Sequence, residues 1–214
     1  KYGFGQKTYI DLYNESKGLV PDRDWKYKIK QQPWFPGETL NVGIGQGYFL
    51  VTPLQLTLAT SSLATAGKTF TPHLLKQVRD SKTDKIDMYD YQNNKFVTSY
   101  PNFDYLDIVH HAMWRVTNER GVGTASQMKK IRSIEIAGKT GTAQVYSLDK
   151  GKTDIKNLQD HALFISYAPF EDPEIVVTVI VEHGGGGSSV AAPIARDVIE
   201  FYINTKEELI SKNE

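Results

Sequence analysis

The sequence predicts a mixed α and β (α+β) fold in which an antiparallel sheet packs against helices. Near the C-terminal end, two apolar runs of strand length, 162–168 and 175–182, are separated by a short turn at 170–173, as in an antiparallel hairpin. Two segments with apolar residues at helical spacing, near 104–116 and 190–202, lie before and after these strands. Strands paired in a hairpin and flanked by helices are typical of this class.

The N-terminal part contains one clearly bounded helix after a loop-rich opening that extends to Thr52. Thr52 at the N-cap, Pro53 at the first helical position and Gln55 three residues after the cap form a capping box with a proline start. We expect the helix to run from about Pro53 to Ala66. It should stop at Gly67, because glycine readily adopts the left-handed conformation that ends a helix.

The middle of the chain alternates between polar and amphipathic segments. A short strand is predicted near 74–78, followed by a polar, turn-rich surface hairpin or excursion over 80–102. An amphipathic helix is then predicted near 104–116. Its apolar positions are Leu106, Val109 and Met113.

The last third of the chain supplies most of the predicted sheet. A strand is predicted over 133–146, and the run 175–181 is apolar nearly throughout, which suits a strand covered on both faces. This run has no proline or inward charge of the kind that protects a sheet edge, so we expect it to be interior. The final helix should place Ile194, Val198, Ile199 and Tyr202 on one face. The charged tail from Thr205 is expected to fray.

The most informative motif is Lys139-Thr140-Gly141-Thr142, which lies within the predicted strand 133–146. Lys139 offers a positive charge for a carboxylate or a neighbouring hydroxyl, and both threonines offer hydroxyls. A strand glycine often marks the close approach of another backbone, so a peptide substrate lying along this edge would add itself as a strand. The backbone N–H of Thr142 is a candidate oxyanion donor. The alternative is a chance tetrapeptide on a surface turn.

The block Asn41 to Leu56 reads NVGIGQGYFLVTPLQL. It does not fit a dinucleotide-binding loop, because its third glycine comes two residues after the second rather than three, and no βαβ unit surrounds it. Together with Lys-Thr-Gly, the block resembles the class B penicillin-binding proteins. In that family a Gly-x-Gly-Gln-Gly turn and Thr-Pro-x-Gln precede the Lys-Thr-Gly strand.

The resemblance covers most of the chain. Trp25, the pair Pro33-Trp34 and the pair Asp160-His161 resemble the cell-elongation type of these proteins rather than the division type. Tyr9 is a departure, since the family more often has glycine there. The other matching segments are 2–5, Thr8, 10–12, 36–39, 168–169 and 182–189.

The resemblance implies a penicillin-binding-protein/β-lactamase-like transpeptidase fold that is incomplete in this chain. Residues 1–204 would form the C-terminal part of the transpeptidase domain, and residues 205–214 a charged tail. The implied activity is that of a peptidoglycan D,D-transpeptidase, which cross-links stem peptides by serine acyl transfer during cell-wall elongation and is inhibited by β-lactam antibiotics. The candidate catalytic residues are Lys139 and Thr142, and the candidate substrate-binding residues are Thr140, Gly141, Thr142, Ala143 and Gln144.

The implied setting also follows from the resemblance. The parent protein would lie on the periplasmic side of the bacterial inner membrane, anchored by an N-terminal segment absent from this chain. Its implied partners are peptidoglycan stem peptides, β-lactam antibiotics and proteins of the cell-elongation machinery. No metal or cofactor is implied.

A nucleophile motif is not convincingly present. Ser-x-x-Lys occurs at 126–129 and at 147–150. Neither serine begins a predicted helix, because Ser126 lies between the predicted helix 104–116 and the predicted strand 133–146, and Ser147 follows that strand. A reactive serine must lie at the start of a helix so that a lysine one turn later can activate it. The segment 211–213 matches the second motif, Ser-x-Asn, but lies among the last charged residues, and 91–93 has tyrosine in place of the serine and lies in a polar loop. Both are expected to be chance matches. In the resembled family both motifs lie upstream of Gly3. We therefore expect an upstream segment of the same domain to supply Ser-x-x-Lys and Ser-x-Asn, and this chain alone to be inactive.

Two alternatives remain open from the sequence. One is a β-lactamase or a β-lactam sensor of the same fold, which slow rather than rapid deacylation would exclude. The other is a non-catalytic binding fragment.

Composition excludes several other classes. Lys plus Arg and Asp plus Glu number 25 each, so there is no basic footprint for nucleic acid. The absence of cysteine rules out disulfides and thiolate metal sites, and no signal peptide or membrane-spanning apolar run occurs. His110 and His111 are expected to face solvent or pack, and His161 and His183 to cap or pack, rather than bind metal. The segment 184–187 lacks the Lys-Ser/Thr of a P-loop and is predicted to be a flexible strand-to-helix turn lining the substrate groove.

Overall fold

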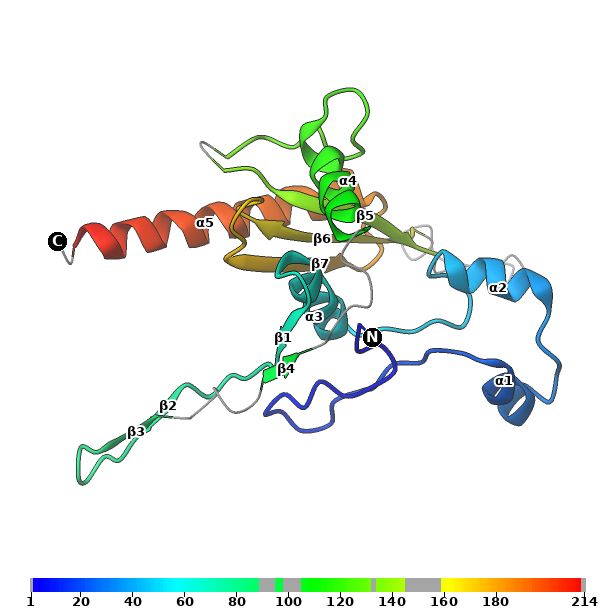
Figure 1. The fold of residues 1–214 in the computed structure, drawn as a ribbon, viewed down its shortest axis with the longest axis horizontal. Helices are drawn as coiled ribbons and strands as arrows, with labels where there is room; N and C mark the ends of the chain where they lie inside the picture. The colour runs from blue at the N-terminus through cyan, green and yellow to red at the C-terminus, as the bar shows by residue number, and fades with distance from the viewer. Residues whose placement is uncertain (1, 89–94, 98–104, 132–133, 145–158, 213–214) are drawn as a thin grey trace. The chain divides into compact units, whose positions relative to one another are not determined.

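The computed structural model describes residues 2–88, 95–97, 105–131, 134–144 and 159–212 (Figure 1). The chain forms two compact units. The first comprises Lys1–Ala59 and Lys68–Ser99, and the second comprises Thr60–Gly67 and Tyr100–Glu214. The predicted mixed α and β class with antiparallel strands is confirmed in both units.

The opening up to Thr52, which was predicted to be loop-rich, contains two short helices, α1 (Arg23–Lys30) and α2 (Pro36–Gly43). The Asp22 carboxylate caps α1 by accepting the Trp25 N–H at 2.7 Å. Helix α2 has Pro36 in its first turn, and Glu38 accepts the Phe35 N–H at 2.7 Å. Both helices are short and neither buries an apolar side chain, so their caps, rather than a buried apolar stripe, define them.

An ion pair joins these two helices. Lys26 is 1% exposed and lies 2.6 Å from Glu38 through Nζ and Oε2. Its ammonium also lies 4.1 Å from the centre of the Phe35 ring. The hydrogen bond from Lys26, followed by that from the Phe35 N–H, lowers the pKa of Glu38 below its usual value. The charge of this buried lysine is therefore balanced by a carboxylate and stabilised by an aromatic face.

The predicted capping box is confirmed at the start of α3 (Pro53–Ala64). The Gln55 N–H donates to Thr52 Oγ1 at 3.1 Å, and the Thr52 N–H donates to Gln55 Oε1 at 3.0 Å. The helix ends two residues before the predicted Ala66, and Gly67 follows with φ +92° and donates its N–H to Ser62 O at 2.8 Å.

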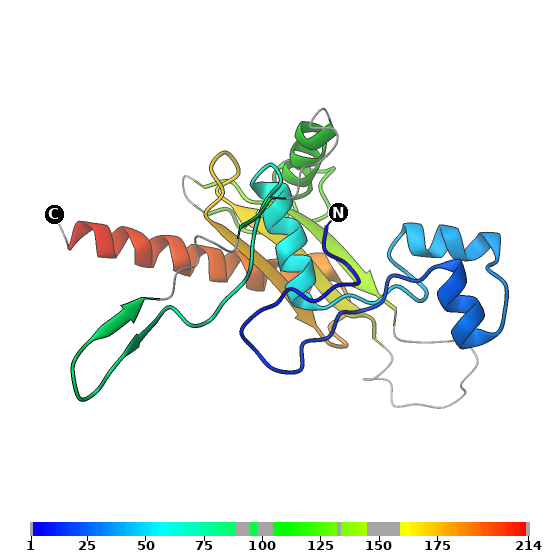
Figure 2. The same ribbon diagram turned by 60° about the horizontal axis from the view of Figure 1, so that its bottom comes forward.

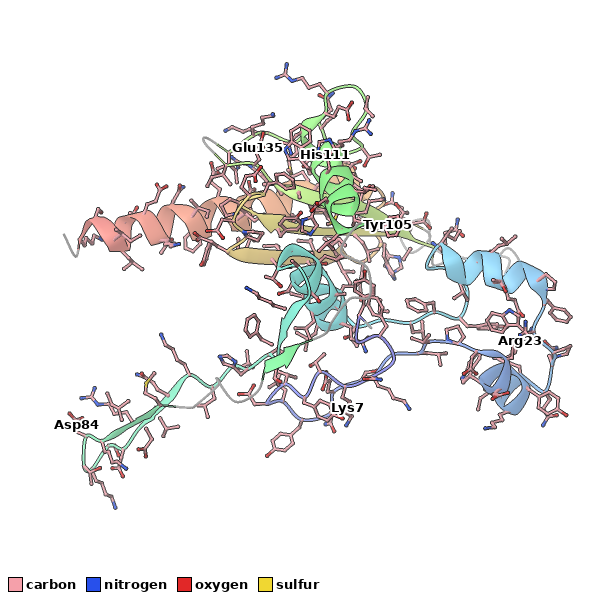
Figure 3. The ribbon with its side chains drawn as sticks, in the orientation of Figure 1. Lys7, Arg23, Asp84, Tyr105, His111 and Glu135 are labelled. Carbon is pink, nitrogen blue, oxygen red and sulfur yellow. The ribbon has the colours of Figure 1, made fainter. Side chains whose placement is uncertain are left out.

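Four short strands complete the first unit. Strands β1 (Lys68–Phe70) and β4 (Lys95–Val97) pair antiparallel, as do β2 (Gln77–Arg79) and β3 (Ile86–Met88). The strand predicted near 74–78 thus begins later, because the Asp11 carboxylate accepts the N–H groups of Leu74 and Leu75 at 2.8 Å each. The predicted surface hairpin within 80–102 corresponds in part to β2 and β3, with Asp84 at its tip (Figure 3).

The second unit is built on a three-stranded antiparallel sheet in the order β5-β6-β7. Its strands are β5 (Ala137–Ala143), β6 (His161–Ala168) and β7 (Ile175–Val181). Strands β6 and β7 form the predicted hairpin, and β5 is shorter than the predicted 133–146 within the described residues. Helix α4 (Leu106–Asn118) precedes the sheet, and a π-helical turn η4 (Gly187–Ala191) leads into α5 (Ala192–Ser211) after it.

Each face of this sheet has its own apolar core. One cluster contains side chains from β6, β7, η4 and α5, and the other contains side chains from α3, α4, β5 and β6. The first includes Phe164, Ala162, Val177, Ala195 and Ile199. The second includes Ala64, Met113, Ala137 and Tyr167. Val109, predicted on the apolar stripe of α4, is 38% exposed instead.

Helix α5 extends to Ser211, beyond the predicted end at Tyr202, and it runs past the end of the sheet (Figures 1 and 2). The predicted single face is wrong, because Ile199 is buried whereas Ile194, Val198 and Tyr202 are exposed. The buried stripe instead consists of Ala192, Ala195, Arg196, Ile199 and Ile203. Within the described ranges, no helix combines the length and apolar character needed to span a bilayer.

Candidate active site

The Lys-Thr-Gly-Thr motif lies on an outer strand of the sheet. Strand β5 pairs with β6 on one side only, among the described residues. In the register of this pair, Lys139 lies opposite Ile165, Gly141 opposite Leu163 and Ala143 opposite His161. Gln144 follows the end of the strand and is exposed. The candidate residues 139–144 therefore form one continuous stretch along a sheet edge, where an extended peptide can pair.

Strand alternation divides the candidate residues between the two faces. Residues directly opposite one another in an antiparallel pair share a face, so Lys139, Gly141 and Ala143 lie on the face of Tyr167 and α4. Thr140 and Thr142 lie on the opposite face, with Phe164 and Ala162. The charge of Lys139 and the two hydroxyls consequently come together only at the outer edge of β5.

The Lys139 ammonium lies against the edge of its own strand. Its Nζ donates to Thr140 O at 2.7 Å, and the side chain is exposed. In an antiparallel ladder the backbone groups of alternate residues point to the same side. Since Thr140 O faces the lysine rather than β6, the backbone of Thr142 faces the same outer edge. This is the orientation that an oxyanion donor on this strand requires.

A threonine outside the motif contacts it. Thr124 Oγ1 lies 3.0 Å from Thr140 Oγ1, so a hydroxyl from the segment after α4 joins the candidate site. Gly123 makes this possible, because a Cβ there would lie 2.2 Å from Arg115 O and the chain folds tightly over the end of α4. Thr124 was not among the residues predicted from the sequence. The two glycines at 121 and 123 were the available signal for a tight turn.

Helix α4 holds the chain just before the motif. Asn118 Nδ2 donates to Ile136 O at 2.9 Å, and the Thr117 hydroxyl donates to the same carbonyl. Trp114 Nε1 donates to Glu135 Oε2 at 2.8 Å (Figure 3 labels Glu135). Because these bonds come from the last turns of one helix, they fix the position at which β5 begins and therefore the position of Lys139.

Gly187, in the turn after β7, packs against the strand that carries the motif. A Cβ on Gly187 would lie 2.4 Å from Leu163 O and 2.5 Å from Gly141 O. The close backbone approach predicted at Gly141 is therefore present, but Gly187 carries the tighter steric constraint. A Cβ on Gly141 would meet only Leu163 Cβ, at 3.2 Å. Gly187, the last residue of the segment 184–187, thus packs against the motif strand and begins η4.

Gly187→Ala is expected to lower the free energy of unfolding of the complete domain by about 2–3 kcal/mol, because two backbone carbonyls would have to move to admit the methyl group. Urea unfolding measures the effect. Gly186→Ala is the matched control, since its Cβ would meet only the Ser189 Oγ at 2.8 Å and that hydroxyl can rotate away. Equal effects of the two substitutions would contradict the close packing of Gly187 on β5.

The four histidines of the sequence analysis pack or cap. His110 Nε2 lies 2.5 Å from Leu63 O, and the His111 ring stacks on Trp114 with centroids 5.3 Å apart. His161 Nδ1 accepts the His183 N–H at 2.9 Å, and the two rings lie 4.9 Å apart. Ser147 and the segment 91–93 lie outside the described residues. Ser211 donates from Oγ to Glu208 O within α5.

Tyr167 lies beneath the Lys139 face of the sheet. It is fully buried, and its hydroxyl has no hydrogen-bond partner among the described residues. Burial, with a smaller contribution from Glu171, raises the pKa of Tyr167 to about 12. The phenol is therefore neutral at physiological pH and acts as packing for the strand.

An edge strand bearing Lys-Thr-Gly-Thr, on an antiparallel sheet with helices on both faces, is typical of the penicillin-binding class of proteins. The family described as "Penicillin binding protein transpeptidase domain" matches residues 1–200, and the chain belongs to this family.

Curated relatives place the chain more closely within the family. It is 38% identical to the peptidoglycan D,D-transpeptidase MrdA of Haemophilus influenzae over 99% of this chain and 33% of that protein. It is 34% identical to MrdA of Escherichia coli K12 over 95% of this chain and 32% of the relative. The chain thus spans about a third of the length of these relatives.

Solved structures share the fold. Pseudomonas aeruginosa PBP2, solved in complex with WCK 5153, has a TM-score of 0.77 and 38% identity. The match covers 94% of this chain and 41% of the P. aeruginosa chain. Helicobacter pylori PBP2, in a complex with MreC, has a TM-score of 0.74 and 35% identity. The match covers 94% of this chain and 34% of the H. pylori chain. The transpeptidase fold named in the sequence analysis, and the resemblance to the elongation-type proteins, are confirmed.

Proposed function

We propose that this chain supplies the Lys-Thr-Gly wall of the active site of a peptidoglycan D,D-transpeptidase that acts in cell-wall elongation. The observation that carries the proposal is the outer edge of β5, which presents Lys139, the Thr140 hydroxyl and the Thr142 backbone side by side. This arrangement suits an extended peptide that ends in a carboxylate and whose reactive carbonyl belongs to the residue before the last.

Each candidate residue has a distinct role in this proposal. Lys139 and the hydroxyls of Thr140 and Thr142 attract the C-terminal carboxylate of the stem peptide or of a β-lactam. The Thr142 N–H stabilises the oxyanion that forms on the penultimate D-Ala carbonyl. Ala143 and Gln144 continue the pairing edge toward the rest of the peptide. Thr124 orients the Thr140 hydroxyl through the 3.0 Å contact.

The reaction is acyl transfer in two steps. A serine oxygen from an upstream segment bearing Ser-x-x-Lys attacks the penultimate D-Ala carbonyl and releases the terminal D-Ala. The amine of a second stem peptide then attacks the resulting ester, forms the cross-link and returns the serine hydroxyl. A β-lactam reacts in the first step and leaves no departing group, so the ester persists.

The setting of the parent protein is part of the same proposal. The relatives are named peptidoglycan D,D-transpeptidases, and one similar protein is described in a complex with MreC. These observations support action on the periplasmic side of the inner membrane, with an N-terminal anchor elsewhere in the parent and with proteins of the elongation machinery as partners.

A β-lactamase or β-lactam sensor of the same fold is the second candidate. The capped α3 with its preceding glycine turn, 43–47, favours the transpeptidase, because this block carries the family resemblance. Deacylation discriminates between the two: an acyl-enzyme that persists for many minutes supports the transpeptidase, and rapid turnover of penicillin supports the β-lactamase.

The 214-residue chain by itself is expected to form no stable covalent adduct with labelled penicillin, because the serine that attacks the lactam lies outside it. Intact-mass spectrometry of the purified chain provides the measurement, and a protein that carries the complete domain serves as the positive control. A stoichiometric acyl adduct on the chain alone would contradict the proposal and direct attention to Ser147.

A further inference from the structure

His161 begins β6 at the end of the candidate site. It lies opposite Ala143 in the β5–β6 register, on the same face as Gly141 and Lys139. It is partly buried. No step of the proposed reaction uses it so far.

The position of the His161 ring is fixed from the turn after β7. Its Nδ1 accepts the His183 N–H at 2.9 Å, and the His183 ring packs edge-on at 4.9 Å between centroids. The same turn is tied to the residue before His161, because the Gly185 N–H donates to Asp160 O at 2.8 Å. A neutral imidazole whose Nδ1 accepts a hydrogen bond carries its proton on Nε2. Nε2 is therefore a donor, and the described residues offer it no acceptor.

The residues in front of His161 are small. Gly141 has no side chain on this face and Ala143 has only a methyl group, so a ligand group that crosses β5 here meets the side chains of β6. Leu163 is the first of these, since its Cβ lies 3.2 Å from the position of a Cβ on Gly141. His161 is the next residue on the same face, and it is the only one of the two that can donate a hydrogen bond.

The direction of the substrate follows from the proposed function, on which this inference rests. Lys139 receives the terminal carboxylate and the Thr142 N–H receives the scissile carbonyl. Continuing along the strand, Ala143 and His161 must face the part of the peptide that lies on the acyl side of the scissile bond. In a penicillin, the acylamino side chain occupies this part.

We propose that the Nε2–H of His161 donates a hydrogen bond to an acceptor oxygen on the acyl side of the substrate, and that His161 is thereby a specificity residue. The ligand group is a carboxylate or carbonyl carried by the peptide residue before the penultimate D-Ala, on the acyl side of the scissile bond. The His183 N–H is the positioning group that keeps the ring in the donor tautomer.

Two penicillins that differ by one carboxylate test this contact. Benzylpenicillin has a phenylacetyl side chain, and its α-carboxy analogue adds a carboxylate at the carbon next to the side-chain carbonyl. The readout is the ratio of second-order acylation rate constants, analogue over benzylpenicillin, in the protein that carries the complete domain. A change in folding or in the nucleophile alters both rate constants together and leaves this ratio unchanged.

His161→Asn and His161→Gln form a matched pair of variants. The Asn Oδ1 can replace Nδ1 as the acceptor for His183 but offers no donor at the Nε2 position, whereas the Gln amide can donate there. We expect the ratio to fall about tenfold in His161→Asn, as for the loss of a hydrogen bond to a charged group. It should stay within about threefold of the wild-type ratio in His161→Gln.

Three results would overturn the inference. A wild-type ratio in a folded His161→Asn variant would show that His161 does not contact the acyl side. An equal fall of the ratio in both variants would show that a donor at the Nε2 position does not account for the preference. If neither penicillin acylates the unmodified protein, the proposed function itself fails, and the inference that depends on it fails with it.

Discussion

Lys139→Ala is expected to slow acylation by a labelled penicillin at least about 100-fold in the protein that carries the complete domain, because it removes the fixed positive charge at the edge of β5. The substitution should hardly affect folding. Lys139 is exposed, and its recorded contact is a hydrogen bond to the carbonyl of its own neighbour, Thr140. We expect a change within about 0.5 kcal/mol in the free energy of unfolding.

The measurement pairs a stopped-flow acylation rate with a thermal melt. Lys130→Ala is the matched control, since Lys130 is also an exposed lysine of the second unit but lies outside the motif strand. Its acylation rate should equal that of the unmodified protein. A normal acylation rate in a folded Lys139→Ala protein would show that the charge is not part of the site.

Two substitutions of different size at Gly141 test the same site. Gly141→Ala places one methyl group 3.2 Å from Leu163 Cβ, which a small shift can absorb, whereas Gly141→Val adds two more carbons on the face that Lys139 shares. Acylation should therefore fall further for valine than for alanine. If both variants acylate at the normal rate, the substrate does not cross β5 at this glycine.

The sequence predicted those elements whose signals are local. The capping box at Thr52 and Gln55 was readable because both partners lie three residues apart and the bonds form within one turn. The hairpin of β6 and β7 was readable because two apolar runs flank a short turn. Helices α1 and α2 were missed for the opposite reason: they carry caps but no apolar stripe, and an ion pair between Lys26 and Glu38 joins them.

The residues of the candidate site also divide into those with a local sequence signal and those that only the fold brings together. Lys139 to Thr142 form a contiguous motif, so sequence alone located them. Thr124 and Gly187 reach the motif only through the fold, one over the end of α4 and the other from the turn after β7. Their sequence separation from the motif is too great for any spacing rule to connect them, so the structure was needed to find them.

The outer edge of β7 is expected to make the chain alone aggregate or remain partly unfolded. β7 was predicted to be interior, yet it is the last strand of the sheet among the described residues, and only Val177 of its residues is buried. Next to it, exposed apolar side chains of α5 and Ile175 of β7 line a hollow of about 520 Å³. The α5 residues that line this hollow are Val198, Phe201, Tyr202, Thr205, Lys206 and Leu209.

A strand with an open, apolar edge pairs with other chains unless a further strand covers it. In the resembled family the outer neighbour of β7 is a strand that precedes the nucleophile, so we expect the upstream segment, added in trans, to convert the chain into a soluble complex that melts cooperatively. Light scattering after size-exclusion chromatography and a calorimetric melt measure the two states.

Ile180→Lys separates the edge from general instability. Ile180 lies on β7 and is 36% exposed, so a lysine there can reach water while it places a charge on the edge strand. This variant should remain more soluble alone than the unmodified chain, and it should be rescued less well by the upstream segment, because the same charge opposes strand addition. A monodisperse monomer of residues 1–214 that melts cooperatively without any addition would show that the sheet is complete within this chain, and the proposed need for an upstream strand would have to be abandoned.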